Sequence, residues 1–418
     1  MVNKTTLHNG IRVITQTIPH AYSVSIGIWV TNGSRNERPA YNGVSHFIEH
    51  LLFKGTEQRT ALQIAREIDS VGGVLNAFTG REFVCYYAKV LADHLPKAVD
   101  LLSDIFLNSR FPEEEIGKER QVILQEIKML EDNPDDYIHD LFHQNVWHGH
   151  PLGMPIIGTV PSVEQLTRDF IVDYKEQHYR ADEIIIAAAG KVEHQQLLRL
   201  LNGVFDQIPK GTGQRVCELP QYGKRFDRVE RDLEQVLLCL GTKALPQNHP
   251  RRFEALLLNT VLGGSMSSRL FQEVREKGAL AYSIYSYLAS HSDAGTMVVS
   301  LGTTAERFEA VVAIILREMR KLKNEPLPAD ELVSTREQIK GHIHLSLESS
   351  DNIMSKLAKN EIYFGGYQPL EQIMAGFDRV TSASVQELCQ ELFDERYFTL
   401  QLMGKLDGVA IDESLISL

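Results

Sequence analysis

Two apolar stretches, Ile-Ile-Ile-Ala-Ala-Ala-Gly at residues 184–190 and Phe-Thr-Leu-Gln-Leu-Met-Gly at residues 398–404, hold matching places in the two halves of this 418-residue chain. Each has the length of a buried strand. Other pieces recur in the same order and at nearly the same offset: the apolar strands 23–28 and 235–240, Phe111-Pro112 and Leu327-Pro328 before acidic helix starts, and Leu166-Thr167 and Val380-Thr381 opening helices. The shared order and offset predict a duplicated chain.

Each half is predicted to run as strand, helix, strand, long helices and a final strand. Residues 84, 86 and 88 alternate with polar neighbours as in a half-covered strand, whereas residues 96–108 and 308–322 have helical spacing. We therefore expect an α+β fold of two homologous domains, each a mainly antiparallel sheet with helices packed on one face. The Gly- and Pro-containing segment 209–223 is the expected linker between residues 1–208 and 224–418.

Composition narrows the class of protein. The net charge of −12 argues against a nucleic-acid binder, which needs a basic face. The sequence contains no run of about 18 apolar residues, so we expect no membrane span. The four cysteines are widely scattered, which favours a reducing compartment. We expect a cytoplasmic bacterial protein, with a processed organellar protein as the alternative.

The segment Gly43-Val-Ser-His-Phe-Ile-Glu-His-Leu-Leu-Phe53 carries the chemistry. Its apolar residues have helical spacing, and His46 and His50 stand one turn apart on the same face. Two imidazoles so placed can supply two of the four ligand positions of Zn²⁺. Glu49 lies beside them and can take a proton from an activated water molecule. The order H-x-x-E-H is the inverted form of the H-E-x-x-H zinc-protease motif.

A catalytic zinc ion needs a third protein ligand and one open position. The helix expected after Pro112 offers several carboxylates, of which Glu119 and Glu126 are seven residues apart and so share a face. Spacing alone does not choose between them, and residue type alone does not separate zinc from manganese or cobalt. His342 and His344 fall near the matching place in the second half, but no helix with partner ligands accompanies them.

With these residues the chain resembles the pitrilysin/insulysin family of inverzincin metallopeptidases. It is most similar to the β-subunit of the mitochondrial processing peptidase and to bacterial single-chain members. The resemblance spans nearly the whole chain, including its two halves. It implies that Glu126, 76 residues after His50, is the third zinc ligand and that Glu119 supports the site from outside the ligand set.

Two further motifs carry the resemblance. The segment Gly72-Gly-Val-Leu-Asn76-Ala77-Phe-Thr79 matches the family's strand that pairs with the substrate backbone, which implies substrate-binding roles for Asn76 and Ala77. In the second half, residues 268–282 match the family's Arg/Tyr element. The resemblance implies that Arg275 and Tyr282 donate hydrogen bonds near the scissile peptide.

The expected activity is that of a zinc-dependent endopeptidase acting on unfolded peptides or presequence-like segments, with Glu49 as the general base. One chain carries both the zinc motif and the Arg/Tyr element, so we expect a homodimer, with a heterodimer containing an inactive paralogue as the alternative. The rival function is a non-catalytic assembly or binding subunit, which the family also contains. A weaker rival is a zinc hydrolase with a non-peptide substrate.

Overall fold

The computed structural model describes residues 2–211, 218–406 and 416–417, and the chain divides into two compact units. Unit 1 comprises Met1–Met129, Met154–Cys217 and Leu345–Tyr367, and unit 2 comprises Leu130–Gly153, Glu218–His344 and Gln368–Leu418. Each unit thus includes a segment from the other half of the chain, unlike the continuous halves 1–208 and 224–418 expected from the sequence. Within the expected linker 209–223, residues 212–217 lie outside the described residues.

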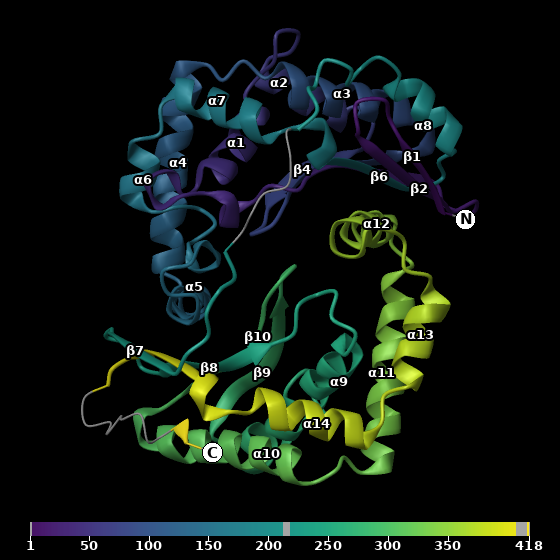
Figure 1. The fold of residues 1–418 in the computed structure, drawn as a ribbon. Coiled ribbons are helices and arrows are strands. Elements are labelled where there is room, and N and C mark those ends of the chain that lie inside the picture. Colours follow the sequence, from purple (N-terminus) through teal and green to yellow (C-terminus); the bar gives the residue numbers. More distant parts are fainter. Residues whose placement is uncertain (1, 212–217, 407–415, 418) are drawn as a thin grey trace. The chain divides into compact units, whose positions relative to one another are not determined.

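Unit 1 is built on a six-stranded sheet in the order β1-β2-β6-β3-β5-β4 (Figure 1). Only the β2–β6 pair is parallel among these neighbours, and the other pairs are antiparallel. The strands are β1 (Val2–Thr6), β2 (Arg12–Thr17), β3 (Ser23–Val30), β4 (Val74–Thr79), β5 (Val84–Leu91) and β6 (Ile184–Gly190). Strand β4 forms one edge of the sheet, which matters for the site described below.

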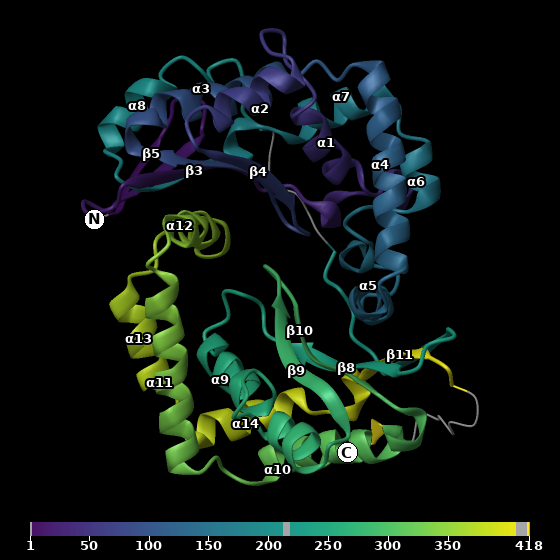
Figure 2. The same ribbon diagram turned by 180° about the vertical axis from the view of Figure 1, so that it is seen from behind.

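Most helices of unit 1 pack on one face of this sheet and share one hydrophobic core with it. They are α1 (Val44–Leu52), α2 (Ala61–Asp69), α3 (Leu95–Asn108), α4 (Glu113–Glu131), α6 (Val160–Glu164), α7 (Arg168–His178) and α8 (His194–Leu201). Seen from behind in Figure 2, α1, α2 and α3 lie together over strands β3 to β5.

The second face of the unit 1 sheet is covered by α12 (Ser350–Phe364), a helix from the far end of the chain. Its residues Met354 and Leu357 pack against Trp29 and Ile185. Strand β6 is consequently buried along its whole length, because Ile184 faces the main core while Ile185 faces α12. A strand covered on both faces is continuously apolar, which explains its sequence.

Unit 2 has a five-stranded sheet in the order β7-β11-β8-β10-β9, in which only β7 and β11 pair in parallel. Its strands are β7 (Arg225–Glu230), β8 (Val236–Ala244), β9 (Ala281–Ser290), β10 (Gly295–Thr303) and β11 (Thr399–Gly404). Its α-helices are α5 (Pro134–Val146), α9 (Arg252–Leu262), α10 (Phe308–Asn324), α11 (Ala329–Ser346), α13 (Leu370–Asp378) and α14 (Ser382–Leu392).

Helix α5 plays the role in unit 2 that α12 plays in unit 1. It comes from the first half of the chain, and its residue Phe142 packs with Leu237 and Met403 on the sheet. The phenyl ring lies so close to Gly241 that a Cβ atom there would be 2.4 Å from Cζ of Phe142. Each sheet therefore has one face covered by helices of its own half and the other covered by one helix from the opposite half.

The repeated sequence pieces occupy equivalent places. The order β2-β6-β3-β5-β4 in unit 1 matches β7-β11-β8-β10-β9 in unit 2, parallel pair included. Thr167 caps α7 and Thr381 caps α14, each accepting a hydrogen bond from the backbone three residues on. The predicted α+β class with two homologous domains is confirmed. Within the described ranges, no helix is both long and apolar enough to cross a membrane.

Candidate metal centre and active site

Helix α1 presents the H-x-x-E-H residues on one side and an apolar surface on the other. Val44, Phe47, Ile48, Leu51 and Leu52 are fully buried and fix the helix on the core. His46 and His50 occupy the opposite side, with 13% and 18% of their side chains exposed. Because burial of the apolar side sets the rotation of the helix, both imidazoles emerge together, with ring centroids 4.6 Å apart.

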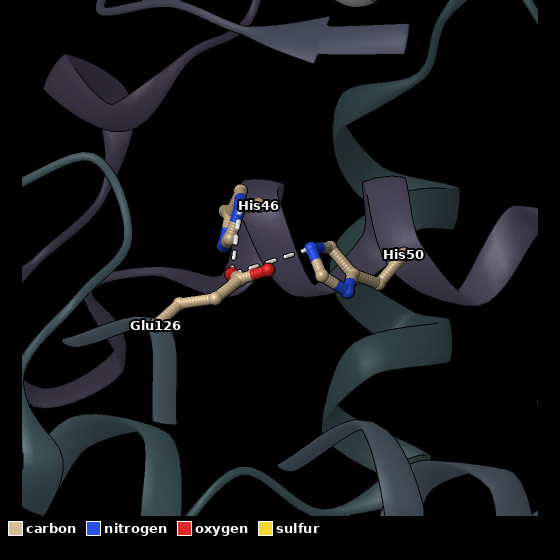
Figure 3. A group of neighbouring side chains, drawn as sticks. All are labelled: His46, His50 and Glu126. Atoms are coloured by element: carbon tan, nitrogen blue, oxygen red, sulfur yellow. Dashed lines mark ion pairs between the residues drawn. The ribbon is translucent and has the colours of Figure 1, made fainter. Parts of the chain in front are cut away.

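Helix α4 brings the third group to the same place. One carboxylate oxygen of Glu126 lies 3.8 Å from Nε2 of His46 and 3.6 Å from Nε2 of His50 (Figure 3). Among the described residues, these three form the one group of at least three His, Cys, Asp or Glu side chains whose ligand atoms all lie within 4.8 Å of one another. Glu126 is thus the carboxylate that lies near Nε2 of both histidines.

Glu119 contacts the back of the site. Its Oε2 lies 3.0 Å from Nδ1 of His50, and its Oε1 lies 2.7 Å from Nζ of Lys54. A carboxylate on Nδ1 fixes the imidazole so that Nε2 is left to bind a metal ion. Glu119 is buried, and Lys54, which the sequence reasoning did not single out, balances its charge.

The protonation states suit metal binding. Burial, and then the neighbouring His50, lower the pKa of His46 to about 3, so its imidazole is neutral at pH 7. The neutral imidazole is the form that coordinates a metal ion. Burial also raises the pKa of Glu49, whereas a hydrogen bond from the Thr79 hydroxyl acts in the opposite direction. A carboxylate with a raised pKa is a stronger base when ionised, as a general base requires.

The donor set fits zinc. Two imidazole nitrogens and one carboxylate oxygen form a catalytic ligand set that leaves a fourth position open. Ligand atoms around tetrahedral zinc are separated by about 3.3 Å, close to the 3.6 and 3.8 Å found between Glu126 and the two histidines.

Strand β4 carries the predicted substrate residues, and its last residue contacts the candidate base. Asn76 is exposed and Ala77 is partly buried on this edge strand, which pairs with β5 on its other side. Thr79, the last residue of β4, donates its hydroxyl hydrogen bond to Glu49. The unpaired edge of a sheet offers backbone N–H and C=O groups to an extended peptide. In this case that edge ends at the candidate base.

The predicted Arg/Tyr pair is assembled within unit 2. Arg275 belongs to a π-helix, Phe271–Lys277, and Tyr282 to β9. The guanidinium carbon of Arg275 lies 5.5 Å from the Tyr282 ring centroid and 4.7 Å from that of Phe271. Tyr282 is 83% exposed, and both residues line a hollow of about 300 Å³. They are available to bind a ligand, and their substrate role stays a prediction.

The two histidines of α11 differ from the α1 pair. His342 and His344 are exposed on α11 and belong to no candidate metal group among the described residues. The described cysteines, Cys85, Cys239 and Cys389, are free and buried, whereas Cys217 lies outside the described residues. Sequence reasoning also missed Glu37, whose carboxylate accepts hydrogen bonds at the start of α1. The available signal was an acidic residue six positions before Gly43, which has no side chain to cap the helix.

Two protein-family models together match most of the chain. The family model described as "Insulinase (Peptidase family M16)" matches residues 12–160, and the model described as "Peptidase M16 inactive domain" matches residues 165–339. The uncharacterized zinc protease YmxG of Bacillus subtilis is 40% identical over 399 residues, covering 95% of this chain and 97% of its own length. An uncharacterized zinc protease of Streptomyces coelicolor is 38% identical over 415 residues, covering 97% and 90%.

Two solved structures share the fold. A protease from Helicobacter pylori superposes with a TM-score of 0.89 at 23% identity, covering 97% of this chain and 99% of that one. A chain described as a peptidase M16 inactive domain, from Pseudomonas fluorescens, superposes with a TM-score of 0.90 at 20% identity, covering 96% and 98%. At these identities the likeness shows the two-unit fold and nothing about activity.

Proposed function

The chain belongs to peptidase family M16, the insulinase family, and from this premise we propose that it is a zinc-dependent endopeptidase. The observation that carries the proposal is the meeting of His46 and His50 with Glu126 beside Glu49. The relatives named zinc proteases support zinc as the metal. The ligand set would be His46, His50 and Glu126.

A bound zinc ion supplies Lewis-acid chemistry, lowering the pKa of water and polarising a peptide carbonyl. Glu49 takes a proton from the attacking water while the water oxygen bonds to the carbonyl carbon. As the C–N bond breaks, Glu49 returns this proton to the leaving nitrogen. Thr79 holds the Glu49 carboxylate through its hydroxyl, so the base keeps one orientation at the end of β4.

The substrates we propose are unfolded peptides or presequence-like segments. An extended peptide would add to the edge of β4, where Asn76 and Ala77 stand and where backbone hydrogen bonding makes few demands on sequence. The family resemblance supports Arg275 and Tyr282 as further donors to the substrate. It also supports a homodimer, since one chain carries both sets of residues, with a heterodimer as the alternative. Light scattering on the purified protein distinguishes the two assemblies.

The test is cleavage of a mixed pool of basic, unfolded peptides by the wild type and by Glu49→Gln, read by mass spectrometry. Both proteins should contain about one zinc ion per chain, because Glu49 is not a proposed ligand. The wild type should cut, and Glu49→Gln should be about a hundred- to ten-thousandfold slower. Zinc in both proteins with cleavage by neither would overturn the proposal and favour a non-catalytic subunit or an obligate heterodimer.

A further inference from the structure

Helix α1 begins without a cap of its own. The first N–H groups of any helix lack partners within it, and a Ser, Thr, Asp or Asn side chain usually accepts from them. The residue in the capping position of α1 is Gly43, which has no side chain and a φ of 92°. A Cβ atom there would lie 2.7 Å from the carbonyl oxygen of Ile157, so the packing admits no other residue without movement.

Glu37 supplies the missing acceptor from outside the helix. Its Oε2 accepts from the backbone N–H of Gly43 at 2.7 Å, and its Oε1 accepts from that of Ser45 at 2.9 Å. The side chain of Asn42 donates a third hydrogen bond to Oε2 at 2.9 Å. Both carboxylate oxygens are therefore used on the chain that enters α1.

This carboxylate is deeply buried, with only 2% of Glu37 exposed. Burial raises its pKa to about 7, although the hydrogen bonds from Ser45, Gly43 and Asn42 oppose the rise. A buried carboxylate is costly unless it is well paired. Its position at the N-terminus of a helix, where the dipole favours negative charge, offsets part of that cost.

Its contacts extend to a second segment of unit 1. The Asn42 amide that donates to Glu37 also donates to the carbonyl of Pro155 at 3.0 Å, and the Asn42 carbonyl accepts from the Ser162 hydroxyl at 2.7 Å. Through Asn42, Glu37 thus links the start of α1 to the segment that contains Pro155 and Ser162. The helix has nine residues, so its first turn governs a large part of its position.

We propose that Glu37 is a positioning residue for the metal centre, which holds the first turn of α1 so that His46 meets Glu126. Ser45, whose N–H it binds, immediately precedes His46, and His50 follows one turn later on the same helix. Metal sites require their ligands within about 0.5 Å and 10–20° of the productive geometry. Release of the first turn permits rotation or fraying of α1, which moves His46 first.

This inference rests on the proposed metal site, and zinc affinity tests it directly. Zinc dissociation constants of the full-length wild type, Glu37→Ala and Glu37→Gln would be measured by competition with a chromogenic chelator. The matched control is Glu361→Gln. Glu361 is another buried carboxylate of unit 1; it stands on α12 and pairs with Lys4 at 2.6 Å. Thermal unfolding of the metal-free proteins reports how much each variant loses in stability alone.

We expect Glu37→Ala to weaken zinc binding about ten- to a hundredfold, as loss of an outer residue that orients a ligand typically does. Glu37→Gln keeps one oxygen acceptor and should lose less. Glu361→Gln should bind zinc as the wild type does, even if it unfolds at a lower temperature. With Co²⁺ in place of zinc, the visible spectrum of Glu37→Ala should change in shape, because the ligands no longer hold one geometry.

Wild-type affinity and an unchanged cobalt spectrum in both Glu37 variants would overturn the positioning role and leave the proposed metal site intact. A wild-type protein that binds no zinc would instead overturn the metal site and this inference together. If Glu37→Ala does not fold, Glu37→Gln decides, since it changes one atom of the side chain. Equal weakening in Glu37→Gln and Glu361→Gln would reduce Glu37 to a general stabilising residue.

Discussion

Helices α1 and α9 follow the equivalent strands β3 and β8, yet only the first carries a metal motif. Both bury an apolar side, through Phe47 and Leu51 in α1 and Leu258 and Leu262 in α9. The side that α1 uses for histidines contains no histidine in α9. Packing therefore constrains only the apolar side of this helix. The opposite side carries the two histidines in unit 1 and none in unit 2.

Helices α4 and α11 differ in the same way. In unit 1, Glu126 of α4 points to the two histidines. In unit 2, Glu331 of α11 forms a two-bond ion pair with Arg269 at 3.0 and 2.7 Å. Carboxylates at different positions of these two helices thus have different partners, an arginine in unit 2 and the proposed metal ligands in unit 1.

The largest effect should come from removing the histidines of α1. His46→Ala/His50→Ala should contain no zinc and lose peptidase activity by roughly a thousandfold or more, because the metal supplies several kcal/mol of transition-state stabilisation. His342→Ala/His344→Ala changes two exposed histidines of α11 and should keep both zinc and activity. Elemental analysis and peptide cleavage measure the pair. Loss of zinc from the α11 variant would contradict the expectation that only the α1 histidines bind the metal.

Phe142→Ala tests whether the helix that covers the unit 2 sheet affects only stability. The ring is fully buried against Leu237 and Met403, so its removal should destabilise the protein by about 3–5 kcal/mol. Urea unfolding measures this loss, and zinc affinity at low urea should match the wild type. Weakened zinc binding in the folded protein would contradict the expectation that the metal centre depends on unit 1 alone.

Glu119→Gln should weaken zinc binding about ten- to a hundredfold, because Nδ1 of His50 loses its carboxylate partner. The matched control in unit 2 is Glu318→Gln, which alters a buried carboxylate paired with Lys321 at 2.9 Å and Arg317 at 3.1 Å. Chelator competition on both variants separates metal support from general charge burial. Equal zinc affinity in the two variants would show that Glu119 does not orient the histidine.

The sequence predicted the parts of this comparison that depend on local spacing. Apolar periodicity placed α1, and the i, i+4 spacing placed His46 and His50 on one side. It left Glu119 and Glu126 unresolved, because residues seven apart share a face and only the packing of α4 on α1 decides which reaches the histidines. The resemblance to a known family, and not the spacing, pointed to Glu126.

The features that the sequence did not predict depend on distant partners. The apolar stripe of α12 would suit any sheet, and nothing local in residues 350–364 indicates a sheet formed mainly by residues 2–190. The same holds for α5 and the unit 2 sheet. Glu37 was likewise missed, since its role lies in hydrogen bonds to residues 43 and 45 that exist only once the loop has folded back.

Helices α7 and α14 provide the subtlest contrast between the units. Eight residues after its capping threonine, α7 has Lys175 and α14 has the buried Cys389. Nζ of Lys175 lies 5.8 Å from the ring centroid of Phe106 and 5.7 Å from that of Phe111, and burial lowers its pKa to about 8. Unit 1 thus has a partly buried cation at pH 7 where unit 2 has a buried, neutral thiol.

This charge should make stability depend on pH in a defined direction. The unfolded chain keeps Lys175 protonated up to about pH 10.4, whereas the folded protein releases the proton near pH 8. Between these values the unfolded state binds more protons, so this residue's contribution raises the stability of the folded state as pH rises. Lys175→Met should therefore be more stable than the wild type at pH 7, by about 1–3 kcal/mol, and this gap in unfolding free energy should shrink by pH 10.

Urea unfolding at both pH values measures the gap. Lys210→Met, at an exposed lysine, controls for the loss of one charge. A gap that stays constant with pH would show that folding does not lower the pKa of Lys175. A wild type more stable than Lys175→Met at pH 7 would show that the two rings stabilise the cation, and would reverse the sign of the argument.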